Sequence, residues 1–476
     1  MVTKLVNNFT IGAFWLIAIV EGLSFWAWQS EILANIAWVL IVLLTAVVSW
    51  RRLDWGLLLV LGEIFIGSHG RWLVLTVNDF ELPLRMGIFV AVLLVALVIW
   101  LKKRQWPWRQ EKYPILYLWP LFALLSFVYG IWQHGAGSAF LDFNGYLFWL
   151  LWPVFIWVRR SDFLINIWRL LVAAVNWLFF KSVFLFWAFT ANVSWLDHEL
   201  MYRWIRDLRF GEITPVNETI WRVFMQSQIY ALALLLICVV VFLYKKNKAL
   251  IDSHWLYWNI FISTFLITMS FSRSFWVGGA VTLGALFVFA LWQGVKYTRL
   301  VTVAASLILL VLIDSWALGL IGGGRGTTTI GERASVSEPA ASSRLAQLGP
   351  LWQEVIARPL LGSGFGETVT YLSEDPRLKN EANPSGVYTT YAFEWGYLDI
   401  WLKMGLFGLL AYLAAIWLPI WRRLAPTSHF GDEMKLSLGW AFALGAVLVV
   451  NIFTPYLNHP LGIAVILINY LPPPEV

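Results

Sequence analysis

The sequence predicts an all-α protein that crosses a membrane many times. Of its 476 residues, 60% are hydrophobic and 13% are charged, and the mean hydropathy is +0.70. Soluble domains carry about 25% charged residues because their surfaces face water, whereas a surface that faces lipid needs none. We therefore expect residues 1–476 to form a single transmembrane domain, a helical bundle of about 12–14 spans of ~20 apolar residues each.

Other features of the composition limit the function. The net charge of +6 arises from lysines and arginines in loops, so no nucleic-acid partner is expected. The single cysteine, Cys238, excludes a disulfide or a cysteine metal site within the chain. The 32 tryptophans are typical of helix ends at the membrane interface, although aromatic residues also line grooves for sugars or lipids. The first apolar stretch continues into further spans without a cleavage site, which indicates a signal anchor.

Apolar runs that could span a bilayer recur along the whole chain. They lie near residues 11–28, 33–50, 54–68, 83–101, 114–132, 141–158, 163–191, 224–243, 255–271, 275–293, 300–320, 395–420, 437–454 and 460–472. The third and the last are short, and we expect them to be tilted, partly re-entrant or merged with a neighbour.

Lysine and arginine are concentrated in the loops after every second span. These basic residues are Arg51, Arg52, Lys102, Lys103, Arg104, Arg109, Lys112, Arg159, Arg160, Lys245, Lys246, Lys248, Lys296, Arg299, Arg422, Arg423 and Lys435. The positive-inside rule makes these loops, and with them the N-terminus, cytoplasmic. The outward segments are then 69–82, 133–140, 192–223, 272–274, 321–394 and 455–459.

The two largest polar segments, 192–223 and 321–394, both lie on the predicted outer face. The first is rich in charge, from Asp197 to Arg222 and including Glu218. The second opens with a glycine and threonine stretch and then predicts an amphipathic helix of roughly three turns, because apolar residues recur at helical spacing: Leu345, Leu348, Leu351, Trp352, Val355 and Ile356. Pro359 and the following glycines end this helix, and the remainder, around 375–386, is expected to be irregular.

Two arginines stand where outward segments enter spans. Arg222 precedes an apolar run, and Arg273 occupies a tight turn in the sequence SFSRSFW. Guanidinium groups form forked hydrogen bonds to phosphate, although a single arginine at this depth can also reach up to a lipid headgroup. Two arginines on one face favour phosphate binding, and Arg344 and Arg85 are weaker candidates of the same kind.

Two further motifs surround the long outer segment. The sequence RPLLGSGFG, residues 358–366, carries alternate glycines, including Gly364, that allow backbone to approach backbone or ligand closely. No Lys-Ser/Thr pair follows, so it is not an ATP-binding loop. At the start of the next span, Glu394 and Asp399 lie near Tyr391 and Tyr397. Carboxylates stabilise a helix N-terminus, but a carboxylate beside apolar walls can also act as a base.

Ionisable residues also occur inside the predicted spans, where charge is costly. These are Glu21, Glu63, Arg169 and Lys181. They could mark a transport pathway or a site for a lipid diphosphate, or they could pair with one another.

The order of these features resembles the O-antigen ligase / O-antigen polymerase superfamily of bacterial membrane glycosyltransferases. It runs from an arginine at a span entrance, through the Ser-Arg turn, to an outer loop with an arginine-led helix, a P-L-L-G-x-G-x-G segment and a span of the form Y-L-x-x-x-x-x-x-G-L-x-G-L-L. Here these are Arg222, Arg273, Arg344, residues 359–366 and residues 397–410. The resemblance covers roughly residues 220–412, and the earlier spans match only in being apolar.

The resemblance implies a C-type glycosyltransferase fold in the bacterial inner membrane, with its active face periplasmic. It implies donors and acceptors on undecaprenyl diphosphate among membrane lipids, no metal and no cofactor, and allows a chain-length regulator protein as a partner. Arginines matching Arg222 and Arg273 would bind the leaving diphosphate. Where ligases are expected to carry a histidine base, this chain has Glu394, which can serve if burial raises its pKa, and polymerases vary more at this site.

The leading prediction is therefore a polymerase of lipid-linked repeat units for O-antigen or exopolysaccharide. Glu394, Arg273 and Arg222 would be catalytic, and Arg344, Arg85, Tyr391, Tyr397 and Gly364 would bind substrate. The alternatives are a ligase that delivers the glycan to lipid A–core or to a protein, and a transporter of solutes or polysaccharide lipids. Transporters often show internal repeats, and we find none in this sequence.

Overall fold

The computed structural model describes residues 7–78, 80–110, 114–158, 162–216, 220–244, 253–321, 339–373, 375, 378–379, 381, 383–424 and 432–471. It confirms an all-α membrane protein, because ten helices within these residues are long and apolar enough to cross a membrane. Parts of the sequence prediction lie outside the described residues: Lys112, Arg159, Arg160, Glu218, Lys245, Lys246, Lys248 and the glycine and threonine stretch 322–328.

The spanning helices follow the predicted apolar runs closely. They are α1 (Asn8–Trp28), α2 (Glu31–Arg51), α4 (Leu84–Lys103), α8 (Phe163–Thr190), α10 (Ile229–Leu243) together with the preceding turn η4 (Gln226–Gln228), α12 (Arg273–Trp292), α13 (Tyr297–Ile321), α16 (Gly396–Leu424), α17 (Asp432–Val450) and a broken run of α6 (Ala136–Phe143), η3 (Asn144–Leu151) and α7 (Trp152–Trp157). The other predicted spans form shorter helices: α3 (Leu53–Ile66), α5 (Leu118–His134), α11 (Ser253–Met269) and α18 (Pro460–Asn469). The short turns of helix are η1 (Pro107–Gln110), η2 (Pro114–Tyr117) and η4 (Gln226–Gln228).

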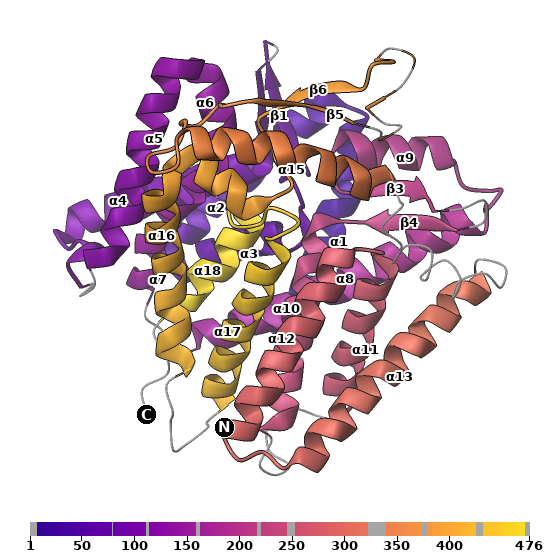
Figure 1. Ribbon diagram of the computed structural model, residues 1–476. Helices are drawn as coiled ribbons and strands as arrows, with labels where there is room; N and C mark the ends of the chain where they lie inside the picture. Colours follow the sequence, from indigo (N-terminus) through magenta and orange to yellow (C-terminus); the bar gives the residue numbers. More distant parts are fainter. Residues whose placement is uncertain are drawn as a thin grey trace.

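Three small antiparallel hairpins, which the sequence did not predict, gather at one end of the bundle. They are β1 (Val74–Val77) with β2 (Phe80–Pro83), β3 (Glu212–Pro215) with β4 (Trp221–Phe224), and β5 (Val369–Leu372) with β6 (Val387–Thr390). Strands of four residues are too short to show a clear alternation of apolar and polar side chains. Figure 1 shows them at the top with α9 (His198–Asp207) and α15 (Pro339–Ala357), and we call this end the hairpin face.

The bundle is built around α10, which is apolar on every side. Nearly all of its residues are buried, as expected for a helix without a polar face. Helices α8, α11, α12 and α17 pack around it. At the periphery, α13 packs on α11 and leans away from α12 towards the hairpin face (Figure 1).

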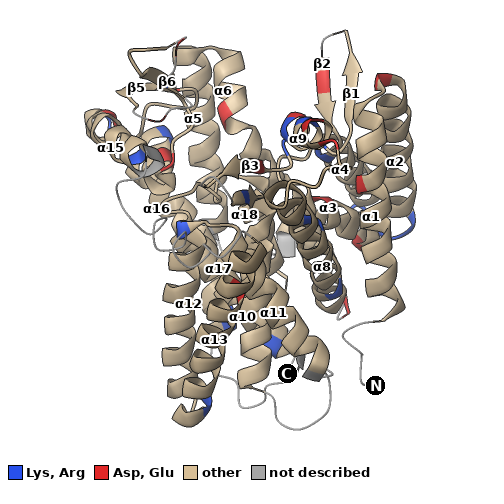
Figure 2. Cartoon of the chain, turned by 90° about the vertical axis from the view of Figure 1, so that its right-hand side faces the viewer, with Lys and Arg blue, Asp and Glu red and all other residues tan. Residues whose placement is uncertain are grey.

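Of the ionisable residues predicted within the spans, Glu21, Glu63 and Lys181 form ion pairs, whereas Arg169 donates a hydrogen bond of 3.0 Å to Asn166 Oδ1. Lys181 Nζ lies 2.6 Å from Glu21 Oε1, and Arg85 Nε lies 2.6 Å from Glu63 Oε2. Both pairs are almost fully buried, so each charge has the partner that a low-dielectric environment requires. Figure 2 shows that the other charged residues lie mostly near helix ends and on the hairpin face.

Helix α15 confirms the predicted amphipathic helix, although it begins earlier, at Pro339. Its apolar residues divide between two sides. Leu351 and Val355 are buried against the protein, whereas Leu345, Trp352 and Ile356 are exposed. The helix therefore lies on the bundle with one side and presents a second apolar side outward, as an interfacial helix does.

Candidate active site

Arg222 contacts the turn that carries Arg273, on the hairpin face. Arg222 lies on β4, opposite Thr214 of β3. Its Nε donates a hydrogen bond of 2.8 Å to the carbonyl oxygen of Ser270, three residues before Arg273. The guanidinium also stacks over Phe224, 4.4 Å from the ring centre, and lies 4.0 Å from Glu212. The structure thus places the side chain of Arg222 against the turn that leads into Arg273.

The turn that carries Arg273, residues 270–274, is held by hydroxyl groups. Phe271 adopts a left-handed backbone conformation with φ of 48°, which reverses the chain between α11 and α12. Ser270 Oγ accepts a hydrogen bond from the Ser272 amide, and Ser272 Oγ lies 3.0 Å from Ser274 Oγ. Thr454 Oγ1 donates to Ser274 Oγ at 3.1 Å. These bonds fix the position of Arg273 at the first residue of α12, where the helix dipole adds to its positive charge.

Glu394, the predicted base, forms an ion pair with Arg344 of α15. The chain around it is bonded to the same helix. The Glu394 amide donates to Gln347 Oε1 at 3.1 Å, and Trp395 Nε1 donates to the Arg344 carbonyl oxygen at 3.0 Å. The side chain of Arg344 is 34% exposed and that of Glu394 is 47% exposed. An acceptor hydroxyl could therefore reach Glu394, but it must compete with the guanidinium of Arg344.

The loop 451–459 between α17 and α18 connects Glu394 with the arginine turn. Trp395, next to Glu394, packs against Phe453 with ring centres 5.9 Å apart. The following residue, Thr454, bonds to Ser274 beside Arg273. The residues next to Glu394 and to Arg273 therefore contact adjacent positions of this loop. Sequence reasoning placed part of this loop outside the membrane but gave it no role.

The glycine segment, residues 358–366, closes a break in helix α16. Gly405 has a φ of 68°, which interrupts the helix. The amides of Ser363 and Gly364 donate to the carbonyl oxygens of residues 402 and 403, and the amides of residues 406 and 407 donate to those of residues 359 and 360. The segment thus satisfies the backbone groups that the break exposes, as burial demands. Gly364 is used for contact between backbones, since a Cβ there would lie 2.8 Å from the Gly130 nitrogen.

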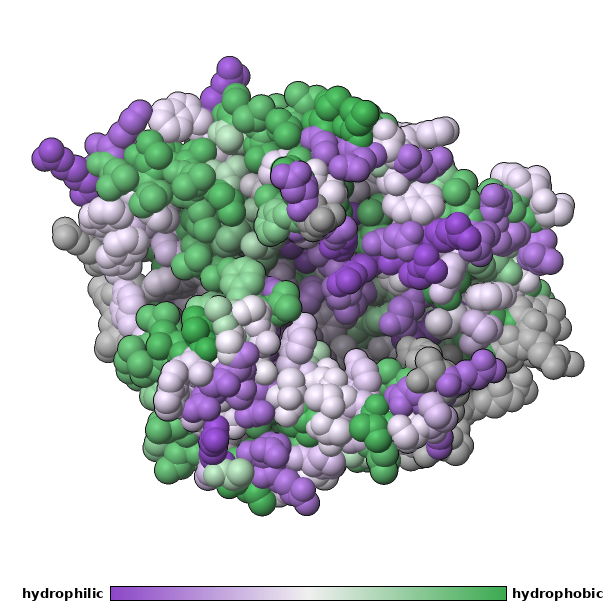
Figure 3. All heavy atoms as spheres, turned by 90° about the horizontal axis from the view of Figure 1, so that it is seen from above, coloured by the Kyte–Doolittle hydropathy of each residue, from purple (hydrophilic) through white to green (hydrophobic). Residues whose placement is uncertain are grey.

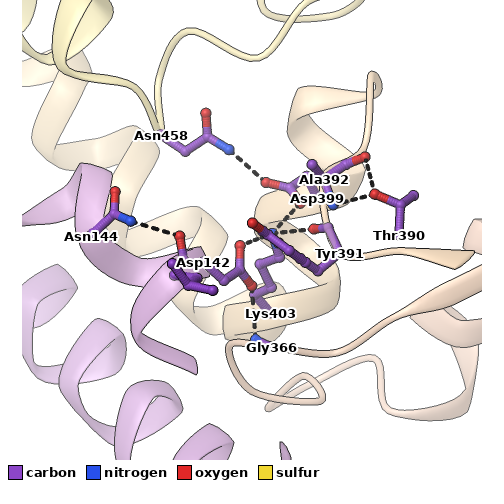
Figure 4. A network of polar contacts seen from close by, with 10 residues as sticks. Asp142, Asn144, Gly366, Thr390, Tyr391, Ala392, Asp399, Lys403 and Asn458 are labelled. Atoms are coloured by element: carbon purple, nitrogen blue, oxygen red, sulfur yellow. Dashed lines mark hydrogen bonds and ion pairs between the residues drawn. The ribbon is translucent and has the colours of Figure 1, made fainter. Parts of the chain in front are cut away.

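A buried ionic cluster lies beside this break. Lys403 Nζ lies 2.5 Å from Asp142 Oδ1 and 2.5 Å from Asp399 Oδ1, and Figure 4 shows it pointing between the two carboxylates. The Gly366 amide donates to Asp142 Oδ2 at 2.8 Å, and Asn458 Nδ2 donates to Asp399 Oδ2 at 2.8 Å. The cluster ties α6, the glycine segment, α16 and the loop 451–459 into one unit.

The remaining predicted substrate-binding residues are Arg85, Tyr397 and Tyr391, and the structure gives each of them a different environment. Arg85 is 3% exposed, and its nitrogens bond to Glu63 and to the carbonyl oxygens of residues 67 and 68. The Tyr397 hydroxyl donates to the Leu448 carbonyl oxygen at 2.7 Å. Tyr391 has an exposed side chain, and its carbonyl oxygen accepts a hydrogen bond from Lys403.

The hairpin face has the shape and polarity of a site for a charged, hydrophilic ligand. Figure 3 shows hydrophilic residues gathered in a hollow near the middle of this face. Two guanidinium groups at one turn can neutralise a departing anion, and a carboxylate on the same face can accept a proton. These are the groups that a transfer reaction with an anionic leaving group requires.

Lys403 and Asp142 were missed by sequence reasoning. Lys403 stands in the middle of a predicted span, where a lone charge indicates a buried partner, and this signal was available. Asp142 stands near a span end, where a carboxylate is unremarkable. Nothing local connects it with a lysine 261 residues later.

Comparison with known proteins identifies part of the chain. Residues 258–413 match the family described as O-antigen ligase. This part runs from α11 to the middle of α16 and includes Arg273, Arg344, Glu394 and Lys403. No curated protein and no solved structure matches the chain. This match over residues 258–413 supports the predicted O-antigen ligase / O-antigen polymerase superfamily and a membrane enzyme of the ligase and polymerase type.

Proposed function

We propose that the protein polymerises oligosaccharide repeat units carried on undecaprenyl diphosphate. The observation that supports this most strongly is the convergence of Arg222 and Arg273 on one turn, with Glu394 on the same face. The hairpin face would then be periplasmic, because the predicted cytoplasmic loops are the basic ones.

The reaction would form one glycosidic bond and break one bond to phosphate. A sugar hydroxyl of the acceptor attacks the anomeric carbon of the donor glycan, and the bond from that carbon to the diphosphate oxygen breaks. The hydroxyl proton passes to the carboxylate of Glu394. Before this step, the acceptor hydroxyl must displace the guanidinium of Arg344 from that carboxylate. The leaving diphosphate keeps the bonding electrons, and Arg222 and Arg273 neutralise its charge, which lowers the barrier.

A ligase of the same superfamily is the second candidate, because the matching family is described as O-antigen ligase. The two activities share the donor and the leaving group and differ in the acceptor. Glu394 stands where a ligase is expected to carry histidine, and this difference favours the polymerase. The products distinguish them, since only a polymerase makes longer chains from lipid-linked repeat units alone.

The test uses the full-length protein in lipid nanodiscs with a purified lipid-linked repeat unit. We expect a ladder of longer lipid-linked glycans, and we expect Arg273→Ala to reduce the rate about 10²–10³-fold, as the loss of one anion-stabilising group does. Glu394→Ala should reduce it about 10²–10⁴-fold through loss of the base. The control is Arg203→Ala, an exposed arginine of α9 on the same face that pairs with Glu199.

Each outcome bears on a different part of the proposal. Wild-type rates in Arg273→Ala or Glu394→Ala would contradict the roles given to these residues. Transfer of a single glycan to lipid A–core, with no ladder, would identify the ligase instead. Solute uptake into proteoliposomes without any glycan product would contradict a transferase altogether.

A further inference from the structure

Two histidines from distant parts of the chain face each other at the hairpin face. His69 lies in the loop between α3 and β1, and His459 is the N-cap of α18. Their rings meet edge to face, with centres 5.7 Å apart. His459 Nδ1 accepts a hydrogen bond of 3.3 Å from the Leu461 amide, so a neutral His459 carries its proton on Nε2, which can donate. Neither histidine has a role in the reaction proposed above.

Arg209, which follows α9, lies beside His69. Ser68 Oγ donates a hydrogen bond of 2.6 Å to the carbonyl oxygen of Phe210, which joins the residue before His69 to the residue after Arg209. The two preceding arginines, on α9, both pair with carboxylates. Arg209 is exposed, and within the described part of the chain no carboxylate pairs with its guanidinium. An unbalanced positive charge therefore stands next to the two histidines.

The surroundings of His69 are concave and positive. Its side chain is exposed, and yet the protein around it desolvates the imidazole. This desolvation, and then the charges of Arg85, Arg209 and Arg71, lower the pKa of His69 from 6.5 to about 4. Arg85 and Arg71 already pair with glutamates. An anion that enters this site would meet the free guanidinium of Arg209 and two neutral imidazoles.

The backbone of Arg209 is also unusual. Its φ is 52°, in the left-handed region that glycine and asparagine adopt most readily. Arginine is therefore not the residue that folding alone would favour at the end of α9. Strained residues of this kind cluster where a side chain binds a ligand, and here the strained residue carries the unpaired charge.

The site stands over the middle of the bundle and not at its lipid-facing rim. His69 follows α3 and His459 begins α18, and both helices are buried on nearly every side. Figure 1 shows these two helices near the middle of the bundle, and Figure 3 shows the hydrophilic hollow near the middle of the hairpin face. An anion reaches such a position from water, so a charged sugar fits it better than the headgroup of a lipid.

The loop 451–459 connects this site with the turn that carries Arg273. Thr454 bonds to Ser274, beside Arg273. His459 follows Thr454 by five residues (459 − 454 = 5), so their Cα atoms are at most about 19 Å apart, at 3.8 Å for each step. A glycan that begins at the arginine turn can span this distance with a few sugars. Residues 69, 209 and 459 lie outside the family match of residues 258–413, which therefore gives them no role.

We propose that His69, His459 and Arg209 form a subsite for an anionic group of the glycan, a sugar carboxylate or phosphate, so that the repeat unit which the enzyme takes is acidic. The inference rests on the proposed function, since the glycan comes from a lipid-linked repeat unit. Arg209 supplies charge-assisted hydrogen bonds, and the imidazoles donate further ones. The subsite positions the repeat unit and touches no reacting atom.

The first experiment determines by mass spectrometry the composition of the lipid-linked repeat unit that the wild type elongates. We expect at least one acidic sugar or phosphate substituent. Arg209→Asn should raise the KM for this unit about tenfold or more, through loss of a hydrogen bond to a charged group, with little change in kcat. Asparagine suits the left-handed backbone, so this variant should unfold at the wild-type temperature or above it. Arg209→Lys keeps the charge and should stay near the wild-type KM, as should the control Arg206→Gln, whose arginine pairs with Asp207.

The outcomes separate this inference from the proposed function. A repeat unit of neutral sugars alone, or an unchanged KM in Arg209→Asn, overturns the inference, although the polymerase proposal survives. An equal rise of KM in Arg206→Gln also overturns it, because the effect would then belong to the charge of the whole face. If the wild type elongates no repeat unit, the proposed function itself fails and the inference fails with it.

A second experiment measures binding without reaction, by calorimetry on the full-length protein in nanodiscs. The probes are a trisaccharide of galacturonic acid, the matching trisaccharide of galactose, and inorganic pyrophosphate. We expect the acidic trisaccharide to bind more tightly than the neutral one, and its Kd to rise about tenfold or more in Arg209→Asn but not in Arg273→Ala. Pyrophosphate should show the opposite dependence.

Two binding results would overturn the inference. Equal affinity for the two trisaccharides would mean that the site does not recognise a sugar carboxylate. Pyrophosphate binding that depends on Arg209 and not on Arg273 would assign the site to the diphosphate of the lipid and not to the glycan.

Discussion

Replacement of Lys403 by methionine should destabilise the protein strongly, because one lysine neutralises two buried carboxylates. The side chains of Lys403, Asp142 and Asp399 are 2%, 5% and 1% exposed. Removal of one partner from a buried ion pair costs about 3–5 kcal/mol, since the remaining charge stays without a counterion. Here two carboxylates lose their shared cation, so we expect about 5 kcal/mol, a loss of roughly a thousandfold or more in the folding equilibrium.

The measurement is thermal unfolding of the purified protein in detergent, followed by the fluorescence of its 32 tryptophans. Unfolding of such a protein is compared at one fixed scan rate, because irreversible steps make the apparent Tm depend on that rate. Lys296→Met is the control, since Lys296 is an exposed lysine between α12 and α13. The triple variant Asp142→Asn/Asp399→Asn/Lys403→Met removes all three charges and should recover much of the lost stability.

Two results would refute this reasoning. If Lys403→Met unfolds at the same temperature as Lys296→Met, the cluster contributes nothing to the stability of the folded state. Alternatively, the triple variant could be no more stable than Lys403→Met, which would mean that the loss arises from packing of the lysine stem and not from unpaired carboxylates.

Three further predictions use other parts of the fold. Gly405→Ala should lower the Tm and the yield, because a Cβ at φ of 68° would lie 2.2 Å from a carbonyl oxygen of the glycine segment. The control Gly284→Ala should leave the Tm unchanged or raise it, because nothing lies within 4 Å of the added Cβ. Arg85→Met should cost about 3–5 kcal/mol by leaving Glu63 unpaired, and Glu63→Gln in the same chain should restore most of the Tm. Burial and nearby positive charge lower the pKa of His459 well below 6.5. The unfolded chain therefore binds more protons than the folded protein, and the Tm should fall as the pH drops from 7.5 through 6.5. The variant His459→Asn should show a smaller fall in Tm over the same pH range.

Much of the architecture could be predicted from the sequence because hydropathy is a local property. A run of about 20 apolar residues must become a helix in lipid, where backbone groups have no water to bond with. The predicted runs therefore correspond to helices throughout the described residues. The amphipathic helix at α15 and the positions of Arg222 and Arg273 before apolar runs depend on the same local patterns.

The partners of the charged residues were decided by the tertiary structure. Arg85 was predicted as a substrate ligand, yet its guanidinium is buried against Glu63. Lys403 meets Asp142 across 261 residues of sequence. The rotation of each helix about its axis, and the neighbour that it faces, are set by packing with distant helices. A local sequence pattern therefore does not determine which neighbour a helix faces.

The sequence by itself therefore determined a polytopic helical membrane protein, the family motifs and two arginines that precede spans on one side. Only the tertiary structure decided that Arg222 bonds to the turn that carries Arg273, that Arg344 pairs with Glu394, and that the glycine segment closes the break at Gly405. The physical reason is that burial in lipid depends on the composition of each segment, whereas the geometry of a site depends on contacts between segments that the chain brings together only when it folds.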